Sequence, residues 1–354
     1  TIATGAASVK QTMNNTLATR YSVDVVASGD ELTQQMADKV ADIKGVTDTV
    51  YAPAASVTLE GANETKPTTA LLIGVKNIGQ IKHVMRVDFG DTNLGADDVL
   101  MPTYTAQTGK KLVFANGKAD FSTAWNNDGD VTRSLALNAK QVDYRRISGN
   151  YGAVGFVDAR HFTNGDLDTS THVLLVKADT ETSGTSVNSL YEDIQSALSK
   201  SADVAVSGPI AERVTWAQMI DSMMMLMVGL IAVAVLVALI GVANTLSLSV
   251  IERTRESATL RAIGMTRGQL RASLAIEALL ISLVSGIAGI LLGTLFGWLG
   301  AYVVFSLYGT VVFPFEWGVN GIVLAVAAVA ALLASVAPAR RAVKVPPVEA
   351  LAEA

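Results

Sequence analysis

The chain has 354 residues, half of them hydrophobic, with a formal net charge of −5 and a mean hydropathy of +0.38. It has no cysteine, which excludes disulfides, thiolate catalysis and cysteine-bound metals. The acidic balance gives no general case for nucleic-acid binding. Hydrophobic residues are concentrated in the last third of the chain. We therefore expect a globular domain over residues 1–210 and a membrane domain over residues 211–354.

The globular part begins and ends with the same order of elements. "YSVDVVAS" predicts a strand, "ELTQQMADKVADIKG" an amphipathic helix, and "VTDTVYAPAASVTLEG" one or two further strands. "THVLLVKA", "SVNSLYEDIQSALSK" and "ADVAVSGP" repeat the order strand, helix, strand. Two β-α-β units predict an α+β domain with a ferredoxin-like split sheet. Residues 61–165, rich in Gly, Asp and Asn, would form a β-rich insert, and "AERVTWAQMID" the stalk to the membrane.

Three segments are apolar enough to cross a bilayer, which requires about 20 residues of helix. They are residues 219–243, 274–305 and 319–336. Buried helices of a soluble core are the alternative, but ungapped apolar runs of this length rarely occur there. We expect an all-α membrane domain of three transmembrane helices.

Basic residues predict the orientation of these spans. Five arginines follow the first span: Arg253, Arg255, Arg261, Arg267 and Arg271. Arg340, Arg341 and Lys344 follow the third span, whereas "SLYGTVVFPFEWG" between the second and third has no Lys or Arg. The positive-inside bias then places the hairpin of residues 250–272 and the C-terminus in the cytoplasm, with residues 1 to about 210 outside. Because such a domain must be delivered across the membrane, we expect the chain to follow an earlier span of a longer protein.

The charged hairpin is more ordered than a topology signal requires. Glu252 with Arg255, and Arg253 with Glu256, are i,i+3 pairs that support a helix. Gly264 is placed to end that helix, and Thr266 to cap the next one near Arg267. From these residues alone, the segment is either an ordered docking element or a solvated loop.

The same stretch resembles the FtsX/MacB-like permeases of ABC transporters, the type VII or mechanotransmission architecture. Their pattern N-T-x-x-x-S-V-x-E-R-x-x-E-x-x-x-L-R-A-x-G is matched by Asn244, Thr245, Ser249, Val250, Glu252, Arg253, Glu256, Leu260, Arg261, Ala262 and Gly264. Ser257-Ala258 departs from it, since an apolar residue usually follows the second Glu. The ending "PARRAVKVPPVEAL" is also similar to that of the family.

The resemblance implies that the hairpin contacts an ATPase subunit. The ATPase-coupling residues would be Glu252, Arg253, Glu256, Leu260, Arg261 and Gly264. It also implies a MacB-like ectodomain with a variable insert. No G-x-x-x-x-G-K-[ST] motif occurs, so we expect no enzyme activity and no catalytic residue. ATP and Mg²⁺ would be bound by a partner ABC ATPase dimer. The three histidines lack metal-ligand spacing, so no metal site is expected.

The second span carries glycines on one helix face: Gly286, Gly289, Gly293 and Gly297. They would serve helix packing within this chain or a dimer interface with a second permease half. We favour the interface, because permeases of this type work in pairs.

These features predict a permease subunit in the bacterial plasma membrane, which couples the ATPase of a partner to movement of the outer domain. Lipids, peptides, lipoproteins and drug-like molecules are the substrate classes considered. The alternative is a signalling platform without export that regulates a cell-wall hydrolase or a sensor kinase. A membrane-anchored adhesion protein would leave the ordered hairpin pattern unexplained.

Overall fold

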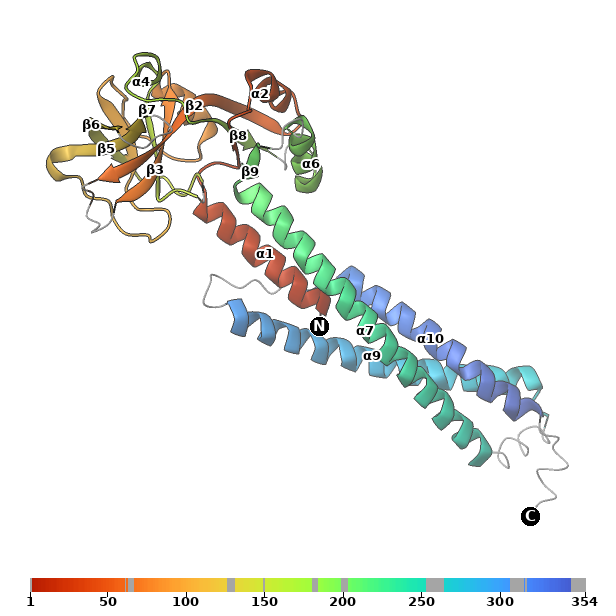
Figure 1. Cartoon of the computed structure of the whole chain (residues 1–354). Helices are drawn as coiled ribbons and strands as arrows, with labels where there is room; N and C mark the ends of the chain where they lie inside the picture. Colours follow the sequence, from red (N-terminus) through yellow and green to blue (C-terminus); the bar gives the residue numbers. More distant parts are fainter. Residues whose placement is uncertain are drawn as a thin grey trace. The chain divides into compact units, whose positions relative to one another are not determined.

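The structure, a computed structural model, describes residues 2–60, 62, 67–125, 131–148, 150–179, 184–198, 203–252, 264–305, 315 and 317–344. The chain divides into a unit of residues 13–217 and a second unit of residues 1–12 and 218–354. The first unit is a sheet-rich α+β domain and the second is helical. Helices α1 (Ile2–Arg20) and α7 (Pro209–Glu252) are each continuous across a boundary between the units (Figure 1).

The two predicted β-α-β segments contribute to one antiparallel arrangement of four strands. These strands are β1 (Val25–Gly29), β2 (Val46–Glu60), β8 (Thr171–Ala178) and β9 (Ala205–Ser207), in the order β2-β8-β1-β9. Helix α2 (Gln34–Ala41) follows β1, and helix α6 (Val187–Leu198) follows β8. This order is that of a split β-α-β sheet.

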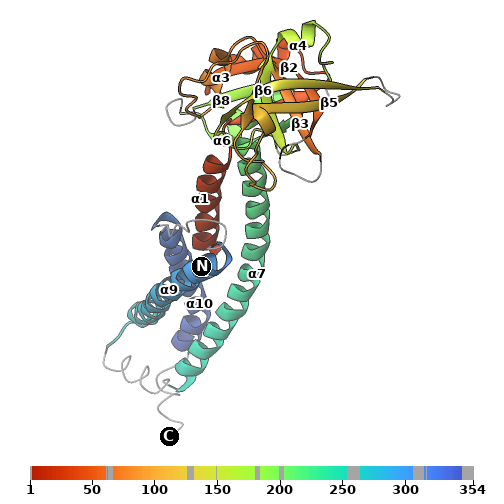
Figure 2. The same ribbon diagram turned by 90° about the vertical axis from the view of Figure 1, so that its left-hand side faces the viewer.

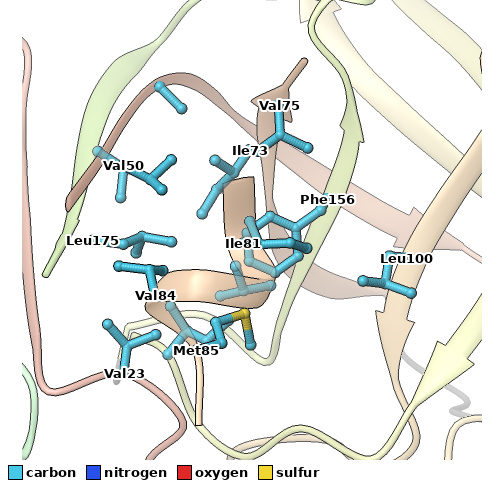
Figure 3. Packing of buried hydrophobic residues seen from close by; sticks show 14 of the residues in the cluster. Val23, Val50, Ile73, Val75, Ile81, Val84, Met85, Leu100, Phe156 and Leu175 are labelled. Atoms are coloured by element: carbon cyan, nitrogen blue, oxygen red, sulfur yellow. The ribbon is translucent and has the colours of Figure 1, made fainter. Parts of the chain in front are cut away.

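Both faces of this sheet are buried, as the hydrophobic runs in β1 and β8 require. On one face, Ala27 and Leu174 pack with Val40 of α2 and Ile194 of α6. On the other face lies helix α3 (Ile78–Val84). Figure 3 shows Ile81 and Val84 beside Val50 and Leu175 of the sheet.

Strand β2 continues beyond the split sheet and takes part in a second, closed sheet. The other strands are β3 (Thr68–Val75), β4 (Asp98–Pro102), β5 (Lys118–Trp125), β6 (Val131–Val142) and β7 (Ala153–Asp158). The pairings β2–β3, β3–β7, β7–β4, β4–β6, β6–β5 and β5–β2 form a closed ring, a β-barrel. Figure 2 shows its long β5–β6 hairpin. Alternate residues, such as Leu72, Met101 and Phe121, fill the interior.

The second unit contains the apolar helices. Two stretches are long and apolar enough to cross a membrane, Pro209–Gly241 in α7 and Gly268–Val303 in α9 (Arg267–Phe305). Helix α10 (Trp317–Lys344) contributes a shorter apolar stretch, Trp317–Leu333. Helices α9 and α10 run antiparallel side by side (Figure 1), and the Ser282 hydroxyl donates to the Ala327 carbonyl at 3.0 Å. The first two expected spans thus coincide with apolar helices, whereas the third stays a prediction.

Candidate functional site

Helix α7 begins at the edge of the split sheet. Pro209 occupies its first position, where a missing N–H leaves no hydrogen bond unmade. The preceding Gly208 has a φ of +105°, and a Cβ there would lie 3.0 Å from the Asp24 carbonyl oxygen. A glycine at this point therefore lets the chain turn tightly from β9 into the helix. No proline interrupts α7 after Pro209, and the helix extends over 44 residues to Glu252.

A polar cluster joins the first turn of α7 to the residue that follows α1. The Tyr21 hydroxyl donates a hydrogen bond to the Glu212 carboxylate. The Arg146 guanidinium lies 5.9 Å from the centre of the Tyr21 ring, within the range of a cation–π contact. Burial raises the pKa of the Tyr21 phenol, and the Glu212 carboxylate raises it further, because both disfavour the phenolate. The two helices are thereby tied together where they meet the domain.

A second contact between α1 and α7 involves opposite charges. Lys10 Nζ lies 2.5 Å from the Asp221 carboxylate. Both side chains are more than one-third exposed, at 36% and 57%, so solvent screens the pair and it contributes little to stability. The ion pair identifies the faces of α1 and α7 that lie against each other.

The start of α9 bears a complete N-terminal capping arrangement. The Gln269 N–H donates to Thr266 Oγ1 at 3.3 Å, while the Thr266 N–H donates to Gln269 Oε1 at 2.9 Å. This reciprocal pair is a capping box, and Met265 packs on Leu270 as a hydrophobic staple. The predicted cap at Thr266 is confirmed. Because the box fixes both the first turn and its entry angle, α9 has a defined start.

Two of the predicted coupling residues belong to the described part of the chain. Glu252 is the last residue of α7, and Gly264 stands just before the capping box. Gly264 has a φ of +112°, a conformation that side chains disfavour, which explains a glycine at this turn. Arg253, Glu256, Leu260 and Arg261 lie outside the described residues, so their coupling role stays a prediction.

The glycine face of α9 is shared between two environments. A Cβ on Gly286 would lie 2.9 Å from Leu324 Cδ2, so Gly286 faces α10. At Gly289 no atom lies within 4 Å of such a Cβ among the described residues, and this glycine is exposed. Gly293 and Gly297 are partly buried. Part of the face thus packs within the chain, and an interface through the remainder stays a prediction.

Of the three histidines, His161 has both ring nitrogens hydrogen-bonded. Nδ1 lies 2.8 Å from Asp166 Oδ2, and Nε2 lies 2.7 Å from the Ala96 carbonyl oxygen. These contacts hold the short helix α4 (Arg160–Thr163) against neighbouring loops. In the described part of the chain, no group of three or more His, Asp or Glu side chains is arranged to bind a metal ion.

Residues 228–347 match the family model "FtsX-like permease C-terminal". These residues are therefore similar to the C-terminal domain of FtsX-like permeases. The permease YknZ of Bacillus subtilis is 34% identical over 137 residues, which are 37% of this chain and 32% of YknZ. The macrolide export ATP-binding/permease protein MacB of Nitrobacter winogradskyi is 33% identical over 128 residues, which are 36% of this chain and 19% of MacB. The matched part is thus a third or less of each relative.

Solved structures also align with this chain. The periplasmic region of MacB from Actinobacillus actinomycetemcomitans covers 55% of this chain and 93% of its own length, with a TM-score of 0.31 and 14% identity. The extracellular domain of YknZ from Gram-positive bacteria covers 52% and 100%, with a TM-score of 0.26 and 12% identity. The similarity to FtsX-like permeases rests on the sequence matches.

Proposed function

We propose that this chain is the permease subunit of an ABC transporter and couples ATP hydrolysis by a partner ATPase to movement of its outer domain. The observation that carries the proposal is an FtsX-like permease domain that shares one uninterrupted helix, α7, with the α+β domain. The partner ATPase dimer binds ATP and Mg²⁺, and a second permease half completes the assembly.

The length of α7 supports a lever role. Its 44 residues extend over about 66 Å at 1.5 Å per residue. The hydrocarbon core of a bilayer is about 30 Å thick, so the helix is long enough to project beyond it. A helix of this kind transmits displacement along its axis because every backbone hydrogen bond in its interior would resist bending. Gly229 and Gly241 are the residues of lowest helix propensity in the interior of α7.

The turn into α9 supports a docking role for the hairpin. At the C-terminal end of the hairpin, a positive-φ glycine is followed by a capping box. Together they fix the angle at which the chain enters α9. A loop whose only purpose is to carry positive charge needs no such construction. The proposed orientation places the hairpin and the C-terminus in the cytoplasm, residues 1–210 outside a bacterial plasma membrane, and the stretch Trp317–Leu333 within a third span.

The test is co-purification of an ATPase from membranes of the native host. Wild type is compared with Glu256→Arg and Arg261→Glu, each made alone and together. We expect wild type to retain an ATPase and to stimulate its turnover, and each charge reversal to reduce retention at least about tenfold, the equivalent of 1.4 kcal/mol. Arg271→Glu is the matched control, because Arg271 is an exposed arginine of α9 outside the family pattern.

Membrane insertion is checked by carbonate extraction and folding by protease resistance of the α+β domain. Equal retention of ATPase by wild type and both charge reversals would contradict the docking role. Loss of ATPase with Arg271→Glu to the same degree would show that only the total positive charge matters. Either result removes the support for coupling through this hairpin.

A further inference from the structure

A cavity of about 660 Å³ opens on the α+β domain where α1 ends. Its volume is that of a small-molecule site, which occupies about 300–1,000 Å³. Arg20, Arg145 and Arg146 line it, and among the described lining residues Asp143 is the single carboxylate. Three guanidinium groups against one carboxylate make this a positive cavity in a chain whose net charge is −5.

The three arginines come from two segments that the backbone holds together. The Arg146 N–H donates to the Arg20 carbonyl at 3.1 Å, and the Ser22 N–H donates to the Arg146 carbonyl at 3.2 Å. The Arg145 N–H donates to the Ser22 hydroxyl at 2.6 Å. These bonds hold the two arginine-bearing segments together before any ligand arrives, so an anion in the cavity would be attracted by positive charge from both.

The guanidinium groups differ in their own contacts. Arg146 donates to the Ala106 carbonyl at 3.0 Å and packs on Tyr21, which fixes its position at the wall. Among the described residues, neither Arg20 nor Arg145 forms an ion pair, and both are exposed. Two planar donor groups therefore remain to receive a carboxylate or phosphate, which guanidinium binds with two parallel hydrogen bonds.

A smaller polar cavity shares two lining residues with this one. A second cavity of about 230 Å³ shares Thr105 and Gln107 with the first, and Thr68, Thr69 and Asn150 also line it. Hydroxyl and amide groups of this kind hydrogen-bond neutral polar groups. The larger cavity thus has a cationic lining, and the smaller one has a neutral, polar lining.

We infer that this cavity binds a ligand with a phosphate or carboxylate group, which Arg20, Arg145 and Arg146 receive, and with neutral polar groups directed towards Thr105 and Gln107. This inference goes beyond the proposed ATPase coupling and does not depend on it. An anionic lipid headgroup and a soluble phosphate compound share the required chemistry.

The test is binding to the purified full-length chain in a neutral detergent, measured by isothermal titration calorimetry at low salt. The probes are inorganic phosphate, short-chain phosphatidylglycerol below its critical micelle concentration, and short-chain phosphatidylcholine as the zwitterionic comparison. We expect saturable binding of an anionic probe that weakens with added salt. Binding of phosphate would indicate a soluble ligand, and binding of phosphatidylglycerol alone a lipid headgroup; both support the site.

Variants locate the binding. Arg145→Glu is expected to lower the affinity for the anionic probe at least about tenfold. Arg145→Lys, which keeps the charge but loses the planar guanidinium group, should lower it about threefold. Lys118→Glu is the control, because Lys118 is exposed on β5 outside both cavities. This variant should bind the anionic probe with the same affinity as wild type. The inference is overturned if no anionic probe binds more tightly than phosphatidylcholine, or if Lys118→Glu weakens binding as much as Arg145→Glu. No ATPase is present, so this result is separate from the test of coupling.

Discussion

The Tyr21 hydroxyl donates to the carboxylate of Glu212, a residue 191 positions later in the chain. Tyr21 directly follows α1, and Glu212 lies in the first turn of α7. Acidic groups are favourable in the first turn of a helix, so Glu212 serves both the helix and the phenol. The hydrogen bond therefore joins the segment by which the chain enters the α+β domain to the segment by which it leaves that domain.

Replacement of Tyr21 by Phe removes this donor and leaves a partly buried carboxylate with one hydrogen bond fewer. The free energy of unfolding is expected to fall by about 1.5–3 kcal/mol, the usual range for a hydrogen bond to a charged group. Denaturant titration of the full chain, followed by tryptophan fluorescence, measures it. Tyr104→Phe is the control, because Tyr104 is 47% exposed, and it should leave the midpoint unchanged. Equal shifts in both variants would contradict a specific role for the Tyr21–Glu212 bond.

Stability of the α+β domain is expected to fall in acid. Hydrogen bonds from Arg160 and His161 lower the pKa values of Asp158 and Asp166, respectively. At Asp98, burial raises the pKa but hydrogen bonds from Lys140 and the Gly95 N–H outweigh it and lower it. Groups with lowered folded pKa values contribute stability that is complete above the unfolded value of about 4 and is lost as the pH falls through the folded value.

Thermal unfolding between pH 7 and pH 2 tests this expectation. The unfolding temperature should be nearly constant down to about pH 5 and then decrease. Asp158→Asn should reduce the acid dependence, because one of the titrating groups is removed. An unchanged slope below pH 4 in this variant would show that Asp158 does not contribute.

Replacement of Thr266 by Ala removes the hydroxyl that caps α9. Loss of an N-cap costs about 1 kcal/mol, so the first turn should open about five times more often. Hydrogen exchange of the full chain in detergent, read on peptides that cover Gln269 and Leu270, measures the change. Thr266→Ser keeps the hydroxyl and should exchange like wild type. Equal rates in the Ala and Ser variants would show that the capping box does not hold this turn.

Substitutions at two glycines of α9 can distinguish packing within the chain from contact with a second subunit. Gly286→Val inserts side-chain atoms against Leu324 of α10 and should destabilise the helix pair. Gly289→Val meets open space in the described part of the chain, so it should leave the isolated chain as stable as wild type. If Gly289 contacts a second permease half, the same change should shift the assembly towards monomer in crosslinking experiments. An unchanged assembly would contradict the predicted interface at this glycine.

The split sheet could be predicted because its strands and helices follow strong local periods. Val25 and Ala27 alternate in face with Val26, and α2 and α6 each bury one apolar stripe. Helix α1 was not predicted, because its buried positions include Ser8 and Thr12, which give no apolar period. The barrel closure was also missed, since parallel pairings such as β3–β7 and β4–β6 join segments far apart in sequence.

The candidate site was predictable in part for the same reason. Thr266 and Gln269 form a short-range signature of helix starts, and a glycine at position 264 signals a turn. The cluster of Tyr21, Arg146 and Glu212 has no such signature, because its members meet only through the tertiary fold.

Strand β2 belongs to both the split sheet and the barrel, and this sets an order for folding during synthesis. Its first half pairs with β8, where Ala54 lies opposite Thr171, while its second half pairs with β3 and β5. When β1, α2 and β2 have emerged from the ribosome, the partner β8 is still more than a hundred residues away. Folding of the barrel brings the middle of β2 and the start of β8 closer together and so lowers the entropy cost of closing that loop. We therefore expect the barrel to form before the four-stranded sheet is completed.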